Sequence, residues 1–104
     1  MKRTLLAALS VVATFAVTTP AFADLALATS KNCMACHAVE KKLVGPSYKD
    51  VAKRYAGDAK AADMLAAKII KGGSGVWGPV PMPANAQVNE ADSKKLAAWV
   101  LSLK

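Results

Sequence analysis

The sequence predicts a small all-α domain, and three features of the chain lead to this prediction. Apolar residues recur at helical spacing in four segments, and residues that favour helix starts and stops stand at their ends. No stretch alternates between apolar and polar residues for long enough to indicate a strand. The expected helices cover about residues 25–32, 47–57, 60–71 and 89–103, and a length of 104 residues favours a single domain.

The helix boundaries rest on capping patterns. Ser47 followed three residues later by Asp50 resembles a capping box, and Asn89 stands in the same relation to Asp92. The third helix is rich in alanine and is expected to stop at Gly72, because glycine favours the C-terminal end of a helix. The apolar residues expected to share helix faces are Tyr48, Val51, Ala52, Tyr55, Leu65, Ile69, Leu96, Trp99, Val100 and Leu103.

The last two helices are joined by a segment rich in glycine and proline between Gly72 and Pro83. A loop of about 16 residues without regular structure is unusual in so small a domain unless it has a function. Its glycines do not indicate a phosphate-binding loop, because the sequence lacks the G-K-[ST] ending and a preceding strand. The segment is therefore expected to serve a functional site.

The first part of the chain resembles a secretory signal peptide. Its basic start, its mostly apolar run over 5–17 and its small residues around 21–23 are the three regions of such a signal. Cleavage is predicted after Ala23, which divides the chain into a signal at 1–23 and an exported, periplasmic domain at 24–104. The alternative is a retained membrane anchor, but the apolar run is shorter than the roughly 20 residues that span a bilayer.

The chain is basic, with a formal net charge of +7. The excess of positive charge remains when Lys2 and Arg3 leave with the signal, and it favours acidic partners or anionic surfaces. No nucleic-acid partner is expected for an exported domain with so few aromatic residues. The cations expected to form a solvated face, and secondarily a docking surface, are Lys41, Lys42, Lys49, Lys53 and Arg54.

The chemistry is expected at Cys33-Met34-Ala35-Cys36-His37. This C-x-x-C-H pattern is typical of covalent haem attachment, because one helical turn then brings both thiols to the vinyl groups on one edge of the porphyrin. The adjacent His37 is then the proximal ligand of the iron. A thioredoxin-like dithiol would need a βαβ pattern, and a zinc site would need four ligands. A disulfide between the two cysteines stays open, although the ring that it closes is too short to stabilise much.

The second axial ligand of such a haem is expected to be Met82. His37 is the only histidine, so two histidine ligands from one chain are excluded. Met34 lies within the attachment turn on the wrong side of the haem, and Met64 falls on a helix face where methionine ordinarily packs into the core. Met82 stands between two prolines in the long loop, which is expected to close over the far face of the haem.

With these segments in place, residues 24–104 resemble the small class I c-type cytochromes of the bacterial cytochrome c-551/c-552 family. The resemblance rests on Cys33-Met34-Ala35-Cys36-His37, Val44-Gly45-Pro46, Gly75-Val76-Trp77-Gly78-Pro79, Pro81-Met82-Pro83 and Trp99-Val100-Leu101. It implies a class I cytochrome c fold, in which about four helices wrap around one covalently bound haem c. It also implies that Cys33 and Cys36 hold the haem through thioethers and that His37 and Met82 are the axial ligands of its iron.

The resemblance implies further roles around the haem. Pro46 matches the proline whose carbonyl accepts a hydrogen bond from the ligand histidine, and Trp77 matches a tryptophan that donates to a haem propionate. Asn85 matches the residue that hydrogen-bonds the methionine sulfur. Lys68 stands where relatives carry arginine near the propionates; it keeps the charge but not the guanidinium fork, so its contact with a propionate stays open. Ala84 stands where many relatives carry another proline.

The expected function is electron transfer without substrate turnover, because an iron with two axial ligands has no open position. The carrier is expected to be a monomer and, from its signal, periplasmic, and the resemblance implies that it accepts electrons from a bc1-type complex. The implied acceptors are a nitrite reductase, a peroxidase or a terminal oxidase, and haem-attachment machinery is a further partner. Two other hypotheses stay open: a peroxidase-like or gas-binding haem without Met82 on the iron, and a membrane-tethered subunit that keeps its signal.

Overall fold

The computed structural model describes residues 7–14 and 20–103. Residues 7–14 are exposed and carry no regular secondary structure. The predicted signal at 1–23 falls partly outside the described residues, and its cleavage stays a prediction. No helix in the two described ranges is both long enough and apolar enough to cross a membrane.

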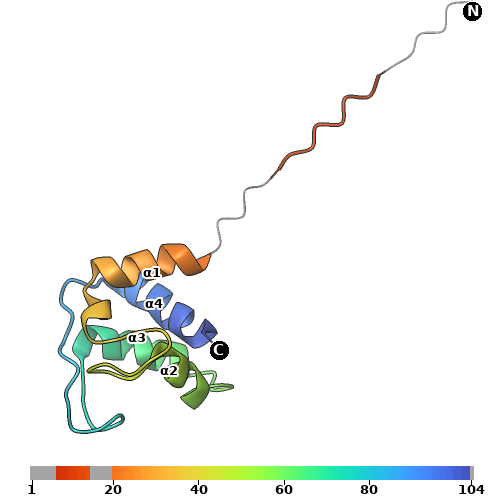
Figure 1. Cartoon of the computed structure of the whole chain (residues 1–104). Coiled ribbons are helices and arrows are strands. Elements are labelled where there is room, and N and C mark those ends of the chain that lie inside the picture. The colour runs from red at the N-terminus through yellow and green to blue at the C-terminus, as the bar shows by residue number, and fades with distance from the viewer. Residues whose placement is uncertain (1–6, 15–19, 104) are drawn as a thin grey trace, which may run out of the picture.

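Four α-helices and one short 3₁₀ helix make up the described domain (Figure 1). In chain order they are α1 (Pro20–Ser30), η1 (Cys33–Ala35), α2 (Tyr48–Arg54), α3 (Ala61–Lys71) and α4 (Glu90–Ser102). The described residues contain no strand, and their one β-bridge is an isolated antiparallel contact between Gly73 and Met82. The predicted all-α fold is confirmed, whereas this bridge was not predicted.

Side-chain caps set the starts of α2 and α4. The Ser47 hydroxyl accepts a hydrogen bond from the Asp50 N–H at 3.1 Å, and the Asn89 carboxamide oxygen accepts one from the Asp92 N–H at 2.8 Å. Each bond satisfies a backbone donor that the first turn of a helix leaves without a partner. Both predicted helix starts are confirmed. The stop of α3 at Gly72 is also confirmed, since this residue has a φ of 72°.

The first helix differs from the prediction, because α1 begins at Pro20 and not near Leu25. Proline is well suited to the first turn of a helix, where its missing N–H has no partner to lose. The helix ends at Ser30, two residues before the predicted end, and a turn through Asn32 follows. Asn32 has a φ of 64°, a left-handed conformation that redirects the chain into η1.

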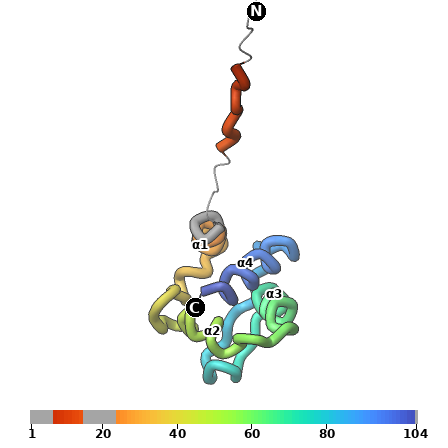
Figure 2. Tube along the Cα trace, turned by 90° about the vertical axis from the view of Figure 1, so that its right-hand side faces the viewer, coloured from red at the N-terminus to blue at the C-terminus, as the bar shows by residue number. Residues whose placement is uncertain are grey.

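The core is organised around α4, which contacts α1, α2 and α3. Figure 2 shows α4 lying between α1 and α3. The buried cluster consists of Ala28, Tyr48, Val51, Val88, Leu96, Trp99 and Val100. The rings of Trp99 and of Tyr48 in α2 pack in a T-shaped arrangement, with centroids 5.4 Å apart. This packing fixes α2, and therefore the chain segment just before it, against the last helix.

Candidate functional site

A cavity of about 310 Å³ brings most of the predicted site together. Its volume lies at the lower end of the range of cofactor pockets, about 300–1,000 Å³. The turn that follows α1 and the loop that follows α3 contribute to the same cavity and lie at the same end of the domain (Figure 1). The predicted site residues that line it are Cys33, Cys36, His37, Pro46, Lys68, Trp77 and Met82. Aliphatic side chains such as Val44, Leu65 and Ile69 form much of the remaining wall.

The two cysteines lie on a single helical turn, as predicted. The amides of Cys36 and His37 both donate to the Cys33 carbonyl, at 3.3 and 3.1 Å, and close η1. Both thiols are free and half-buried. Burial raises the pKa of the Cys33 thiol above its ordinary value, because an apolar wall disfavours the thiolate. The turn therefore presents two free thiols, three residues apart in the sequence, to the same cavity.

The imidazole of His37 is held by three neighbours. Its Nδ1 lies 2.8 Å from the Pro46 carbonyl oxygen, so this nitrogen carries the proton and donates. The Tyr48 ring stacks on the imidazole with centroids 4.9 Å apart and an angle of 22°. Gly45 packs so closely that a Cβ there would lie 2.8 Å from Nδ1. The remaining ring nitrogen, Nε2, is the one available to a metal, in the tautomer that suits a ligand histidine.

Tyr48 belongs to the site although the sequence placed it only on a helix face. Its backbone N–H donates to the Ala38 carbonyl at 2.9 Å, and its ring lies against His37. Burial first, and then the charge and hydrogen bond of Cys33, raise the pKa of the Tyr48 hydroxyl well above its ordinary value. The hydroxyl therefore stays protonated beside the first cysteine. The helical pattern carries no signal for this stacking, which follows from the path of the chain between His37 and the start of α2.

The loop that carries Met82 is closed at its base by main-chain hydrogen bonds. The Gly73 N–H donates to the Met82 carbonyl at 3.0 Å, and the Met82 N–H donates to the Gly73 carbonyl at 2.7 Å. Gly72 packs against the backbone of residues 82–84, where a Cβ would collide with the Met82 carbonyl oxygen and lie 2.8 Å from the Ala84 nitrogen. The backbone of Met82 is thus fixed to the end of α3 while its side chain lines the cavity.

The other two methionines of the described domain lie elsewhere. Met34 packs against the buried cluster, whereas Met64 is 36% exposed on α3. Neither side chain is among the residues that line the cavity. The core-packing role predicted for Met64 is wrong, because α3 buries Ala61 and Ala66 and packs Leu65 and Ile69 against the core cluster.

Two predicted polar residues lie near the mouth of the cavity. Trp77 is 40% exposed, and the guanidinium carbon of Arg54 lies 4.8 Å from the centroid of its ring. The ammonium group of Lys68 lies against the backbone of Gly73, where a Cβ would be 2.7 Å from Nζ. The contact between Arg54 and Trp77 was not predicted, because Arg54 had been assigned to the solvated face of cations.

Asn85 does not line the cavity. Its Nδ2 donates to the carbonyls of Ile69 and Pro83, at 2.8 and 3.4 Å, and its backbone N–H donates to the Ile70 carbonyl at 3.1 Å. The Met82 sulfur is not among its hydrogen-bond partners within the described residues, so that predicted bond stays a prediction. Asn85 anchors the end of the loop to carbonyls of the last turn of α3.

Comparison with known proteins decides the family. The cytochrome c family profile matches residues 25–104. The chain belongs to the cytochrome c family. Cytochrome c-551 of Allochromatium vinosum is 57% identical over 83 residues, which cover 80% of this chain and 88% of that protein. Cytochrome c-552 of Hydrogenobacter thermophilus is 59% identical over 83 residues, with 80% and 84% coverage.

A solved structure of a cytochrome c supports the same assignment. The crystal structure of Nitrosomonas europaea cytochrome c552 superposes with a TM-score of 0.75 at 55% sequence identity. The superposition covers 77% of this chain and 99% of that one. The fold is therefore that of a class I cytochrome c, and the resemblance found in the sequence is confirmed.

As a cytochrome c, the protein carries one covalently bound haem c and acts as a monohaem electron carrier that works with redox partners. The residues of the cavity fit this group. Two half-buried thiols stand on one turn, the histidine has its Nδ1 committed to a carbonyl, and aliphatic side chains form an apolar wall.

Proposed function

We propose that the chain is a periplasmic carrier of single electrons whose haem is attached through Cys33 and Cys36 and whose iron is held between His37 and Met82. The observation that carries this proposal is the joint position of His37 and Met82 on one cavity, with the His37 Nδ1 already bonded to the Pro46 carbonyl. When bound, the haem supplies the one-electron chemistry. Two protein ligands leave the iron no position for a substrate, so the protein performs no turnover of its own.

The residues around His37 keep this ligand in one orientation. The bond to the Pro46 carbonyl fixes the tautomer of His37 and makes its Nε2 a more basic metal ligand. The Tyr48 ring and Gly45 limit rotation of the imidazole. On the other wall, the thioether of Met82 favours the ferrous state and therefore a relatively high reduction potential. A fixed ligand geometry in both oxidation states keeps the reorganisation that accompanies electron transfer small.

The polar residues at the mouth are proposed to serve the haem propionates. The indole N–H of Trp77 and the ammonium of Lys68 are donors on the cavity wall, where a carboxylate would otherwise be poorly solvated. Asn85 is proposed to hydrogen-bond the Met82 sulfur, as the resemblance implies, by exchanging its longer bond to Pro83 for this one.

The electron partners are proposed to be acidic redox proteins. Lys41 and Lys42 stand beside Leu43, whose side chain is exposed although apolar. Positive charge around an apolar contact steers a negatively charged partner and lets it dissociate quickly. A bc1-type complex is the proposed donor, and a nitrite reductase, a peroxidase or a terminal oxidase is the proposed acceptor. The carrier is proposed to act as a monomer.

We propose that the signal at 1–23 directs export and is then removed by cleavage after Ala23. The mass of the protein purified from the periplasm tests this directly. A mature chain that begins at Asp24 and carries the mass of one haem supports the proposal, whereas retention of Met1 excludes it.

Visible absorption spectra test the axial ligands. Sharp c-type bands after reduction with dithionite, together with a weak long-wavelength sulfur-to-iron band in the oxidised protein, are expected for the His37 and Met82 pair. The matched variant is Met82→Ala, which should lose the sulfur-to-iron band and keep the haem attached. A wild-type protein with broad high-spin bands would exclude Met82 as a ligand.

A further inference from the structure

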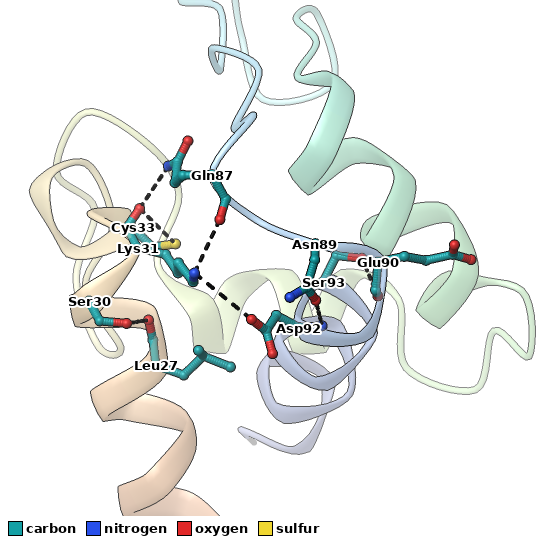
Figure 3. A network of polar contacts seen from close by, with 9 residues as sticks. All are labelled: Leu27, Ser30, Lys31, Cys33, Gln87, Asn89, Glu90, Asp92 and Ser93. Atoms are coloured by element: carbon teal, nitrogen blue, oxygen red, sulfur yellow. Dashed lines mark hydrogen bonds and ion pairs between the residues drawn. The ribbon is translucent and has the colours of Figure 1, made fainter.

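Gln87 lies outside the cavity and bonds to the segment just before the Cys33 turn and to the segment just after Met82. Its Nε2 donates to the Lys31 carbonyl at 3.0 Å and to the Asn85 Oδ1 at 3.1 Å. The Lys31 ammonium donates back to the Gln87 carbonyl at 3.1 Å. Figure 3 shows the exchange between Lys31 and Gln87, with each side chain reaching the backbone of the other residue. Two segments 56 residues apart in the sequence are joined in this way.

The bond from Gln87 Nε2 to the Lys31 carbonyl lies at the start of the haem-attachment turn. Lys31 stands two residues before Cys33, and its carbonyl also accepts a hydrogen bond from the Cys33 thiol, with Sγ at 4.0 Å (Figure 3). Gln87 therefore holds the peptide group that leads into the turn with both cysteines and His37. The contact of Lys31 with Asp92 is weaker, because the ammonium and carboxylate are 3.9 Å apart and only partly buried.

The second bond, from Gln87 Nε2 to Asn85 Oδ1, helps to orient the Asn85 carboxamide. Because Oδ1 accepts from Gln87, the Nδ2 of Asn85 is turned to the Ile69 and Pro83 carbonyls. Pro83 directly follows Met82. Gln87 and the Ile69 carbonyl thus together favour the orientation in which the donor end of the Asn85 amide faces the segment that carries the methionine.

We propose that Gln87 is a positioning residue for the axial methionine, which acts through Asn85 and ties the Met82 loop to the turn that carries Cys33 and His37. The proposal rests on the axial pair put forward above. Without the Gln87 carboxamide, Asn85 Oδ1 loses its donor, and the bond from the Lys31 ammonium to the carbonyl of residue 87 is the one bond of this exchange that remains. Met82 should then leave the iron more readily while the rest of the fold stays intact, because Gln87 itself is exposed.

Competition by imidazole for the ferric iron measures how readily Met82 leaves. The test uses the purified, haem-loaded protein well below its unfolding temperature. Gln87→Ala removes the amide, and Gln87→Met removes it while keeping a side chain of similar length. Both are expected to raise the affinity for imidazole about fivefold, which corresponds to one net neutral hydrogen bond. Both should also lose the sulfur-to-iron band at a lower temperature than the wild type.

Two control variants separate positioning from general destabilisation. Asp92→Asn removes the ion pair of Lys31 but leaves the three bonds of Gln87, and Glu90→Ala breaks the exposed pair with Lys94 in α4. Both controls are expected to bind imidazole like the wild type. If the Gln87 variants bind imidazole like the controls while the wild type shows the sulfur-to-iron band, the positioning role is wrong and the axial pair stands. If the wild type itself lacks the band, the axial pair fails and the positioning role fails with it.

Discussion

The wall that carries His37 and the wall that carries Met82 are held by different interactions. His37 is fixed by side-chain packing that continues into the core, since the Tyr48 that stacks on it is only 7% exposed and also packs on Trp99. Met82 is fixed by main-chain bonds at the base of a loop whose tip is open, with Val80 61% exposed. The histidine wall can loosen only with the core, whereas the methionine wall can open on its own.

The largest effect is expected on the histidine wall, from Gly45→Ala. The added Cβ would lie 2.5 Å from the His37 Cε1, so the ring must move and lose its bond to Pro46. We expect a loss of about 3 kcal/mol in the free energy of unfolding, as for overpacking in a core, and a steep fall in the yield of haem-loaded protein. Chemical denaturation and the haem absorbance per chain measure both.

Gly57→Ala is the control for that variant. It also places a side chain at a glycine, but nothing lies within 4 Å of the new Cβ, and its cost is the strain of a φ of 78°. Its free energy of unfolding should fall by about 1 kcal/mol, and its haem loading should stay complete. Equal haem yields from the two variants would contradict the account of His37.

A smaller effect on folding is expected from Met82→Ala on the other wall. The side chain is half-buried and its backbone bonds to Gly73 remain, so we expect a loss of about 2 kcal/mol in stability. The reduction potential should fall by on the order of 0.2 V, because the thioether that favours the ferrous state is gone. Potentiometry and denaturation measure the two quantities, and an unchanged potential would exclude Met82 as a ligand.

Gly72→Ala should loosen the loop while Met82 is still present. The new Cβ would collide with the Met82 carbonyl at a φ of 72°, at a cost of about 1–2 kcal/mol for the backbone alone. The sulfur-to-iron band should disappear on heating before the helices unfold, as followed by absorption and circular dichroism. Gly75→Ala carries backbone strain in the same loop, at a φ of 95°, but its Cβ meets nothing within 4 Å, so its two transitions should lie closer together than those of Gly72→Ala. Coincident transitions in both variants would mean that the loop does not open separately.

The smallest effect is expected at the mouth, from Arg54→Ala. The guanidinium over the Trp77 ring is a partly exposed cation–π contact, worth about 0.5–1 kcal/mol. Arg54→Lys should retain part of this stability, because it keeps the charge but not the flat stacking surface. Thermal unfolding of both variants beside Lys53→Ala tests the contact. A loss as large for Lys53→Ala as for Arg54→Ala would assign the effect to net charge.

The sequence could predict those parts of the site that depend on residues close together in the chain. Cys33, Cys36 and His37 lie within five consecutive residues, so their spacing alone brings them onto one turn. The caps at Ser47 and Asn89 are local as well, and both helix starts were predicted correctly. Met82 could be singled out because the chain has one histidine and because prolines flank this methionine.

The features that were missed depend on contacts between distant segments. The stacking of Tyr48 on His37, the contact of Arg54 with Trp77 and the exchange between Lys31 and Gln87 each require the packed arrangement of helices. Helical periodicity assigns a residue to a face and does not say which side chain lies opposite. The exposure of Met64 was missed for the same reason, since Ala61 and Ala66 are the buried residues of α3 and Leu65 is the neighbour that packs against the core cluster.

A potentiometric titration of the haem-loaded wild-type protein, followed by visible absorption with and without carbon monoxide, tests the central claim most directly. A closed iron between His37 and Met82 predicts one reversible transition with the slope of a single electron and the same midpoint and spectra under carbon monoxide. A midpoint that rises under carbon monoxide, with a changed ferrous spectrum, would show that the gas reaches the iron and would contradict a closed electron carrier.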